Sequence, residues 1–338
     1  MGAQGAASAA IYGLSGLRLT DAERAFLAAA QPWGLILFAR NVAAPDQVRA
    51  LLAEARAACG RHVPVFIDQE GGRVARLRPP HWRAWGPPAA EGPGPAGRER
   101  LGLRMRLIAA ELAALGIDGN CAPMLDLAAP GAHEIVSSRV LADSPEEIAA
   151  RGLIVAEALL AGGVLPVIKH IPGHGRARAD SHAELPVVAA PRAALEADFA
   201  PFRALAGLPL AMTAHVVYTA IDPALPATLS PACIRLIREE IGFAGALMSD
   251  DIGMAALSGA MGERAAAALA AGCDLVLHCS GEMDEMRAVA AAVPRLSGEA
   301  LARVQAAEAA RRAPEPFDIA AAEARHAALG EAIRGAAA

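Results

Sequence analysis

The sequence predicts one (β/α)8 barrel of the TIM type, an α/β fold, with extra helices at the C-terminus. Eight short apolar runs alternate with eight helical patterns over about 290 residues. Most of these runs are continuously apolar, which is typical of parallel strands buried on both faces. Eight β–α units in this length fit one closed barrel better than two separate sheets.

We expect the whole chain, 1–338, to form one barrel domain, with a core over about 10–295 and a helical extension over 296–338. The predicted strands are 10–14, 34–38, 63–68, 119–126, 164–170, 209–215, 244–250 and 274–278. The predicted helices are 21–30, 45–58, 97–115, 145–161, 191–206, 231–241, 262–271 and 284–293.

Several helix boundaries carry their own signals. Thr20 with Glu23 predicts a capping box, and residues 144–147, Ser-Pro-Glu-Glu, predict a second one with proline in the first turn. Gly162 and Gly163 are expected to end that second helix. Residues 78–97 are rich in proline and glycine, so we interpret them as a long loop after the third strand.

Composition excludes several classes of protein. The chain has a net charge of −5, which offers no basic surface for nucleic acid. It lacks the roughly 18 consecutive apolar residues of a membrane span. The first ten residues contain no basic residue before their small apolar stretch, unlike a signal peptide. We therefore expect a cytoplasmic, monomeric protein without nucleic-acid or membrane partners.

The cysteines do not predict a disulfide framework or a thiolate zinc site. Five cysteines are widely spaced, and no CxxC pair occurs. We expect them to be buried, small apolar residues: Cys59, Cys121, Cys233, Cys273 and Cys279.

Polar or ionisable residues stand at the ends of six of the eight predicted strands. In a (β/α)8 barrel the active site forms at the C-terminal ends of the strands, so this distribution predicts an active site. These strand ends contain residues 68–73, Asp126, Lys169 with His170, Thr213 with His215, residues 249–251, and His278.

The segment 169–182 is the richest in chemistry. It begins with Lys169, the single lysine beside thirty arginines, so chance is the weaker explanation for its presence there. His170, His174 and His182 allow a metal site, but proline and glycine interrupt the segment and no H-E-x-x-H pattern is present. The alternative is acid/base chemistry, in which the carboxylate of Asp180 orients the imidazole of His182 and raises its pKa.

Asp250 and Asp251 end a buried strand. Adjacent strand residues point to opposite faces, so we expect only one of the two to face the pocket and the other to make structural hydrogen bonds. A carboxylate at this position suits a nucleophile that attacks an anomeric carbon and forms a covalent glycosyl intermediate.

Four segments together resemble glycoside hydrolase family 3, and in particular its bacterial cytoplasmic β-N-acetylhexosaminidases of peptidoglycan recycling. The resemblance covers about residues 10–300, and the segments occur in the family's order. They are residues 68–76 (Asp-Gln-Glu-Gly-Gly-Arg-Val-Ala-Arg), 169–175 (Lys-His-Ile-Pro-Gly-His-Gly), 180–182 (Asp-Ser-His) and 249–254 (Ser-Asp-Asp-Ile-Gly-Met).

The resemblance implies a role for each matching residue. Asp250 would be the nucleophile, and His182, assisted by Asp180, would be the general acid/base. The residues implied to bind the sugar hydroxyls are Asp68, Arg76, Arg139, Lys169 and His170. No metal or other cofactor is implied.

Two positions depart from the family pattern. Arg139 follows Val136-Ser137-Ser138, where the family more often has Gly-Asp or Gly-Glu before the arginine, and Ile171 replaces the commoner phenylalanine. Relatives that act on plain glucosides generally use a glutamate acid/base and a second domain. The Asp180–His182 pattern instead favours N-acetylglucosamine.

The expected activity is that of a retaining exo-β-N-acetylglucosaminidase that removes terminal non-reducing N-acetylglucosamine from peptidoglycan-derived muropeptides. The alternative is an N-acetylglucosaminide phosphorylase or a β-glucosidase of the same family. A phosphorylase is considered because a neutral histidine base repels phosphate less than a carboxylate does. A metal-dependent hydrolase on the same barrel and a catalytically silent sugar-binding protein are the other possibilities.

Overall fold

The computed structural model describes residues 7–179, 181 and 184–337, and it confirms the predicted (β/α)8 barrel. Neighbouring barrel strands are parallel, and β1 pairs with β12 to close the barrel, with Ala10 beside Val276. In sequence order the strands are β1 (Ser8–Gly13), β2 (Pro32–Leu37), β3 (Val65–Ile67), β6 (Gly119–Asn120), β7 (Leu165–Ile171), β9 (Leu210–Thr213), β11 (Ala246–Asp251) and β12 (Leu275–His278).

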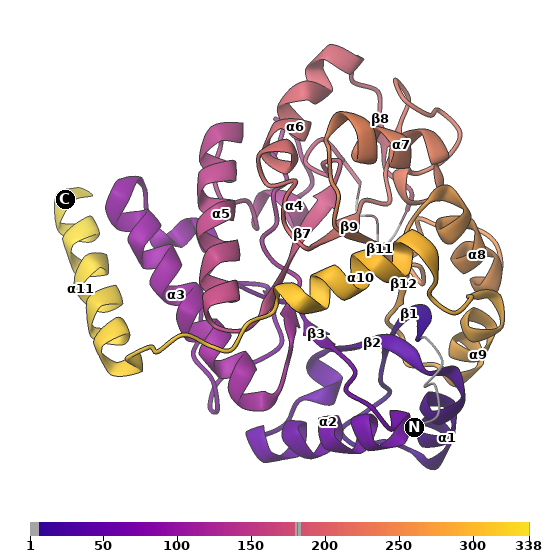
Figure 1. Cartoon of the computed structure of the whole chain (residues 1–338). Helices are drawn as coiled ribbons and strands as arrows, with labels where there is room; N and C mark the ends of the chain where they lie inside the picture. The colour runs from indigo at the N-terminus through magenta and orange to yellow at the C-terminus, as the bar shows by residue number, and fades with distance from the viewer. Residues whose placement is uncertain (1–6, 180, 182–183, 338) are drawn as a thin grey trace.

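Helices surround the barrel (Figure 1). They are α1 (Asp21–Ala30), α2 (Pro45–Cys59), α3 (Gly94–Leu115), α4 (Glu134–Ser137), α5 (Pro145–Ala161), α6 (Arg192–Ala204), α7 (Pro231–Arg235), α8 (Met261–Ala271), α9 (Met283–Ala292), α10 (Gly298–Ala310) and α11 (Ile319–Ala337). Every helix predicted between strands is present, although α7 continues as a π-helical turn over Leu236–Glu240.

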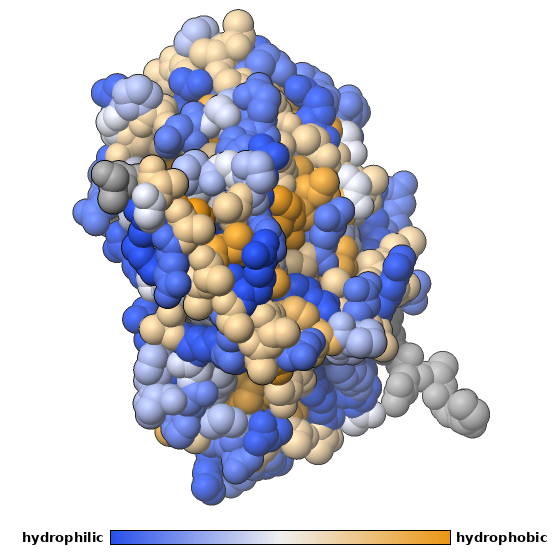
Figure 2. Space-filling model, turned by 90° about the vertical axis from the view of Figure 1, so that its left-hand side faces the viewer, coloured by the Kyte–Doolittle hydropathy of each residue, from blue (hydrophilic) through white to orange (hydrophobic). Residues whose placement is uncertain are grey.

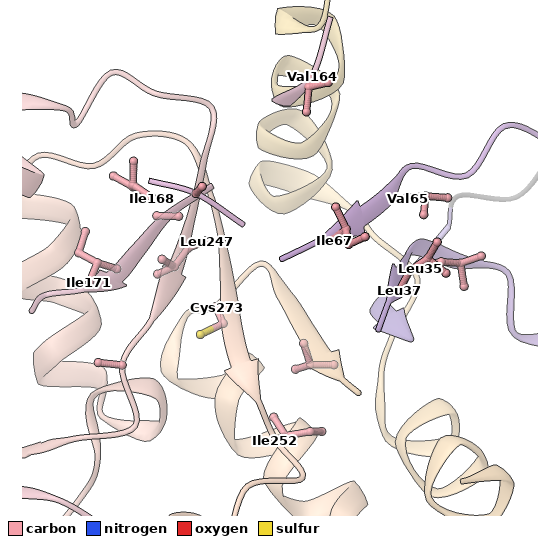
Figure 3. Close-up of a cluster of buried hydrophobic side chains, with 14 of the residues drawn as sticks. Leu35, Leu37, Val65, Ile67, Val164, Ile168, Ile171, Leu247, Ile252 and Cys273 are labelled. Carbon is pink, nitrogen blue, oxygen red and sulfur yellow. The ribbon is translucent and has the colours of Figure 1, made fainter. Parts of the chain in front are cut away.

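Apolar side chains form two layers because successive strand residues point to opposite faces of the sheet. One set points into the barrel, where Trp33 and Phe66 pack with ring centroids 5.6 Å apart. The other set points outward to the helices, as Leu35 and Ile67 do (Figure 3). Burial on both faces explains why these strands read as continuous apolar runs.

The last two helices occupy different places. Val304 of α10 packs with the interior residues of the barrel, and the indole Nε1 of Trp33 donates to Glu308 on the same helix. Because α10 closes the N-terminal end of the barrel, the opposite end is left for a site. In contrast, α11 lies beside α3 at the outer edge (Figure 1). Figure 2 shows that side of the molecule as a mosaic of hydrophilic and weakly hydrophobic residues, with some strongly hydrophobic residues near its centre.

The predicted boundary signals are confirmed except for one. Thr20 and Glu23 form the complete capping box of α1, and Gly162 ends α5. Ser144 accepts a hydrogen bond from the amide of Glu147, as expected, but the reciprocal bond is missing. The carboxylate of Glu147 pairs instead with Arg98 and Arg151, because these guanidiniums offer stronger, charge-assisted bonds.

Some features of the fold were not predicted from the sequence. Residues 78–97 include a 3-10 turn at Pro88–Glu91, and a small hairpin, β4 (Gln69–Gly71) with β5 (Val74–Ala75), precedes them. A second pair is β8 (Val187–Val188) with β10 (Val217–Tyr218). All five cysteines are buried free thiols, as predicted. None of the helices in the described ranges is both long and apolar enough to cross a membrane.

Candidate active site

A cavity of about 440 Å³ opens at the C-terminal ends of the barrel strands. Its apolar lining includes Ile36, Met212 and Leu277, which belong to the interior layer of the barrel. Its polar lining comes from β7 and β11 and from the segments that follow β2, β3, β6 and β12. The volume lies within the roughly 300–1,000 Å³ typical of small-molecule sites.

Asp250 and Asp251, at the end of β11, both line this cavity, so the expectation that only one would reach it is wrong. Their partners nevertheless differ. The carboxylate of Asp251 accepts the amides of Gly253 and Cys279, at 2.9 and 3.1 Å, whereas one oxygen of Asp250 accepts the amide of Asp251 at 2.8 Å. Asp251 therefore fixes the surrounding loops in the way predicted for the structural member of the pair.

Lys169 is almost completely buried and is held by two carboxylates. Its Nζ lies 2.8 Å from Asp68 Oδ1 and 2.6 Å from Glu70 Oε1. Burial alone would lower the lysine pKa, but the two negative charges outweigh this effect and raise the pKa above its usual value. Lys169 is therefore a charged ammonium in the cavity wall and not a neutral amine.

Two arginines complete this cluster. Arg139 makes a two-pronged contact with Glu70, with Nε 3.0 Å from Oε2 and NH2 2.7 Å from Oε1. Arg76 NH2 lies 3.0 Å from Asp68 Oδ2. The four sequence-predicted residues Asp68, Arg76, Arg139 and Lys169 are thus brought together, and Glu70 joins two of them.

The carboxylates of this cluster are ionised. Burial opposes ionisation, but the charges of Arg139 and Lys169 dominate and lower the pKa of Glu70 to about 2. Burial likewise opposes ionisation of Asp68, yet Lys169 and Arg76 bring its pKa below the usual value. Buried charges are stable only when paired, so the cluster acts as one rigid polar unit.

His170 lines the cavity, and the carboxylate of Asp126 orients its ring. Its Nδ1 lies 2.7 Å from Asp126 Oδ2, and the other oxygen of Asp126 accepts the backbone amide of His174 at 2.6 Å. Burial alone would raise the pKa of Asp126, but His170 and His174 outweigh this effect and leave the pKa below its usual value. Asp126 therefore fixes the ring of His170 and the start of the following loop.

His174 faces the loop that carries the predicted acid/base pair. Its Nε2 lies 3.1 Å from the hydroxyl oxygen of Ser181, and burial lowers the pKa of His174 to about 4. Ser181 also lines a cavity of about 20 Å³ together with Asp250. The predicted residues Asp180 and His182 lie outside the described residues.

Two residues of the site were not predicted from the sequence. Glu70 is in the quoted motif and Asp126 was among the polar strand ends, but neither was given a role. The available signal for Glu70 was an acidic residue two positions after Asp68, and for Asp126 an acidic residue at a strand end. Neither signal distinguishes a ligand-facing carboxylate from one that holds other side chains.

The polar residues at the ends of two other strands, His215 and His278, contact residues around the site. His215 lies between Thr228 and the backbone oxygen of Asp251, at 2.7 and 2.9 Å. His278 contacts Glu285 at 2.9 Å. Within the described ranges, no cluster of three His, Cys, Asp or Glu side chains is placed to hold a metal ion.

Comparison with known proteins agrees with this arrangement. The family described as glycosyl hydrolase family 3 N terminal domain matches residues 8–313. A "Beta-hexosaminidase" of Alkalilimnicola ehrlichii is 44% identical over 282 residues, which cover 80% of each chain. Native NagZ from Neisseria gonorrhoeae superposes with a TM-score of 0.84 at 31% identity, over 96% of this chain and 98% of that one. NagZ of the same organism in complex with N-trifluoroacetyl-D-glucosamine gives 0.83 at 30% identity, over 98% and 99%.

Proposed function

The chain belongs to glycosyl hydrolase family 3, and from this premise we propose that it is a retaining exo-β-N-acetylglucosaminidase acting through a glycosyl–Asp250 intermediate. It is a glycoside hydrolase of the β-N-acetylhexosaminidase class, the class of its relatives. The proposal adds the stereochemistry, the residues and the substrate. Its main support is that Asp250 lines the same cavity as the polar cluster built on Asp68 and Lys169.

The polar cluster is suited to bind one sugar. Hydroxyl groups can both donate and accept hydrogen bonds, so they match a wall that combines carboxylates and cations. Asp68, Arg76, Arg139, Lys169 and His170 all line the cavity. Because these side chains are paired and buried, the sugar would meet groups that are already in place, which lowers the entropic cost of orienting it.

The proposed reaction begins with protonation of the leaving oxygen. His182, supported by Asp180, would donate this proton while Asp250 attacks the anomeric carbon through an oxocarbenium-like transition state. Neutral His182 would then activate water, which releases the sugar with retained configuration. Ser181 is their chain neighbour and lines a small cavity with Asp250, which supports the assignment.

The substrate we propose is a peptidoglycan-derived muropeptide with terminal N-acetylglucosamine. Support comes from the Asp-Ser-His motif at residues 180–182 and from the Neisseria NagZ complex with a glucosamine derivative. We also propose a cytoplasmic location, as in the enzymes that the motifs resemble.

Hydrolysis of 4-nitrophenyl N-acetyl-β-glucosaminide, compared with the corresponding glucoside, tests the proposal. We expect the N-acetylglucosaminide to be the preferred substrate and free N-acetylglucosamine to be the product, with or without phosphate. Preference for the glucoside would favour a β-glucosidase, and formation of a sugar phosphate would favour a phosphorylase. Absence of turnover with retained binding would favour a sugar-binding protein.

A further inference from the structure

The cavity lining contains more cationic than anionic side chains, although the protein as a whole has a negative net charge. The chain carries a net charge of −5, yet five cationic side chains line the cavity against three carboxylates among the described residues, and Glu70, which pairs with Arg139 and Lys169 from behind the lining, offsets part of this excess. The five are Arg40, Arg73, Arg76, Arg139 and Lys169. Since N-acetylglucosamine is uncharged, binding this sugar does not require an excess of positive charge. The excess therefore points to a further, anionic part of the ligand.

Two of the five cations form no ion pair among the described residues, and the carboxylates of Asp251 and Glu282 act on Arg40 only at longer range. Arg76, Arg139 and Lys169 are balanced by the carboxylates of the buried cluster described above. Arg40 instead donates to the backbone oxygens of Leu14 and Cys279. The guanidinium of Arg73 has no hydrogen-bond or ion-pair partner in residues 7–179, 181 and 184–337. Both arginines are exposed, so they belong to the mouth of the cavity and not to its floor.

A rigid hairpin presents Arg73. Gly71 ends β4 and Gly72 begins the turn to β5, and their φ angles of 102° and 60° favour glycine. The amide of Gly72 donates to the oxygen of Trp85 at 2.8 Å, and buried Arg104 donates to the oxygen of Glu70. Because this backbone is already fixed, only the side-chain freedom of Arg73 would be lost on binding.

Arg40 is held in place as well. Its guanidinium lies 4.9 Å from the ring centroid of Phe38, and that of Arg76 lies 5.3 Å from the same centroid. Phe38 also lines the cavity. The aromatic ring thus connects the mouth arginine to the sugar-binding cluster, because Arg76 is paired with Asp68.

We propose that Arg73 and Arg40 bind a carboxylate on the aglycone, the part of the substrate that leaves, and so select anionic aglycones. This inference rests on the proposed function, which places the sugar at Asp250 and the leaving group toward the mouth. The planar fork of a guanidinium matches a carboxylate through two parallel hydrogen bonds. Phosphate shares this chemistry, and the test below separates it from an aglycone carboxylate.

The experiment uses two aryl N-acetyl-β-glucosaminides that differ only in a ring carboxylate or its neutral carboxamide. For each enzyme the measured quantity is the ratio of kcat/KM for the carboxylate substrate to that for the carboxamide substrate. We expect Arg73→Gln to lower this ratio about 5- to 20-fold, mainly through KM, and Arg73→Lys to lower it less. Raising the salt concentration should lower the wild-type ratio toward that of Arg73→Gln.

Arg235→Gln is the matched control, because Arg235 is an exposed arginine of α7 that does not line the cavity. Its ratio should equal that of the wild type. An unchanged ratio in Arg73→Gln would overturn the proposal, and so would phosphate-dependent formation of a sugar phosphate that is lost in this variant. Turnover of the carboxamide substrate by the wild type separates these outcomes from failure of the proposed function, in which neither substrate would be cleaved.

Discussion

Glu70 is the residue on which the proposed sugar-binding wall depends most. It lies behind the cavity, only 3% exposed, and its two oxygens hold Arg139 and Lys169. It does not line the main cavity, so we regard it as a positioning residue. Without its charge, two buried cations would compete for the remaining carboxylate of Asp68.

We therefore predict that Glu70→Gln lowers the free energy of unfolding by about 3–5 kcal/mol and kcat/KM by roughly 100-fold. Kinetics with an aryl N-acetyl-β-glucosaminide and urea denaturation measure the two effects. The dissociation constant of N-acetylglucosamine should also rise, a change that reduced stability alone would not cause.

Glu111→Gln is a suitable control, since Glu111 pairs with Arg83 and does not line the main cavity. It should leave kcat/KM unchanged. If Glu70→Gln retained kcat/KM within about twofold of the wild type, the positioning role would be wrong.

His174 makes a pH-dependent contribution to stability. Its pKa is about 4 in the folded protein, against 6.5 for an unperturbed histidine, because burial disfavours the charged ring. The folded pKa is depressed, so between pH 6.5 and 4 the unfolded chain binds a proton that the folded chain does not. The stability is thus fully present above pH 6.5 and is lost as the pH falls toward 4.

We predict that the wild type loses roughly 3 kcal/mol more than His174→Gln between pH 7 and pH 4. Urea denaturation of both proteins across this range measures the difference. Parallel pH profiles for the two proteins would show that His174 does not titrate as the structure indicates.

At the scale of elements, the β4–β5 hairpin and α11 are connected by a buried polar network. Arg104 of α3 contacts Glu91 Oε1 at 3.0 Å and Gly86 O at 2.8 Å, and also donates to Glu70 O. His326 of α11 lies 2.8 Å from the other oxygen of Glu91. The outer helix is thereby linked, through Glu91 and Arg104, to the hairpin that positions Glu70.

Arg104→Met should consequently destabilise the protein by about 3–5 kcal/mol and also lower kcat/KM. The comparison is Arg98→Met on the same helix, which breaks an exposed ion pair with Glu147 and should destabilise the protein far less. Thermal denaturation and steady-state kinetics on both variants test this. Equal, small effects would contradict the proposed link from α3 to the hairpin.

The elements differ in how well the sequence predicts them. Buried strands such as β7 and β11 are long apolar runs that end in polar residues, so both the strands and Asp250 at the end of β11 were predicted. The β4–β5 hairpin has strands of three and two residues, too short for a periodic pattern. Because that hairpin determines where Glu70 points, the partner of Lys169 and Arg139 could not be inferred from sequence.

Asp251 illustrates the same limit. Strand alternation predicts opposite directions for Asp250 and Asp251, but both reach the cavity because the strand pairing is irregular between Met248 and Asp251. A local shift in register changes which face a side chain meets. Only coordinates reveal such a shift, whereas the family resemblance, by implying that Asp250 is the nucleophile, left the structural role to Asp251.

For the whole molecule, the arrangement leaves one open end. The helix α10 covers the N-terminal end of the barrel, and the polar strand ends gather at the other. The proposed sugar-binding cluster, the proposed nucleophile and the exposed arginines therefore all face the same open end of the barrel. This arrangement is what an exo-acting enzyme requires, because only a terminal sugar reaches the closed end.

The proposed covalent bond between the sugar and Asp250 can be observed directly. In His182→Ala, an aryl N-acetyl-β-glucosaminide with a very good leaving group should still react, while release by water is slow. Rapid acid quenching, proteolysis and mass spectrometry should then show one N-acetylglucosaminyl residue on the peptide containing Asp250, and none in the double variant with Asp250→Ala. An adduct on another carboxylate, or turnover by Asp250→Ala close to that of the wild type, would contradict the account.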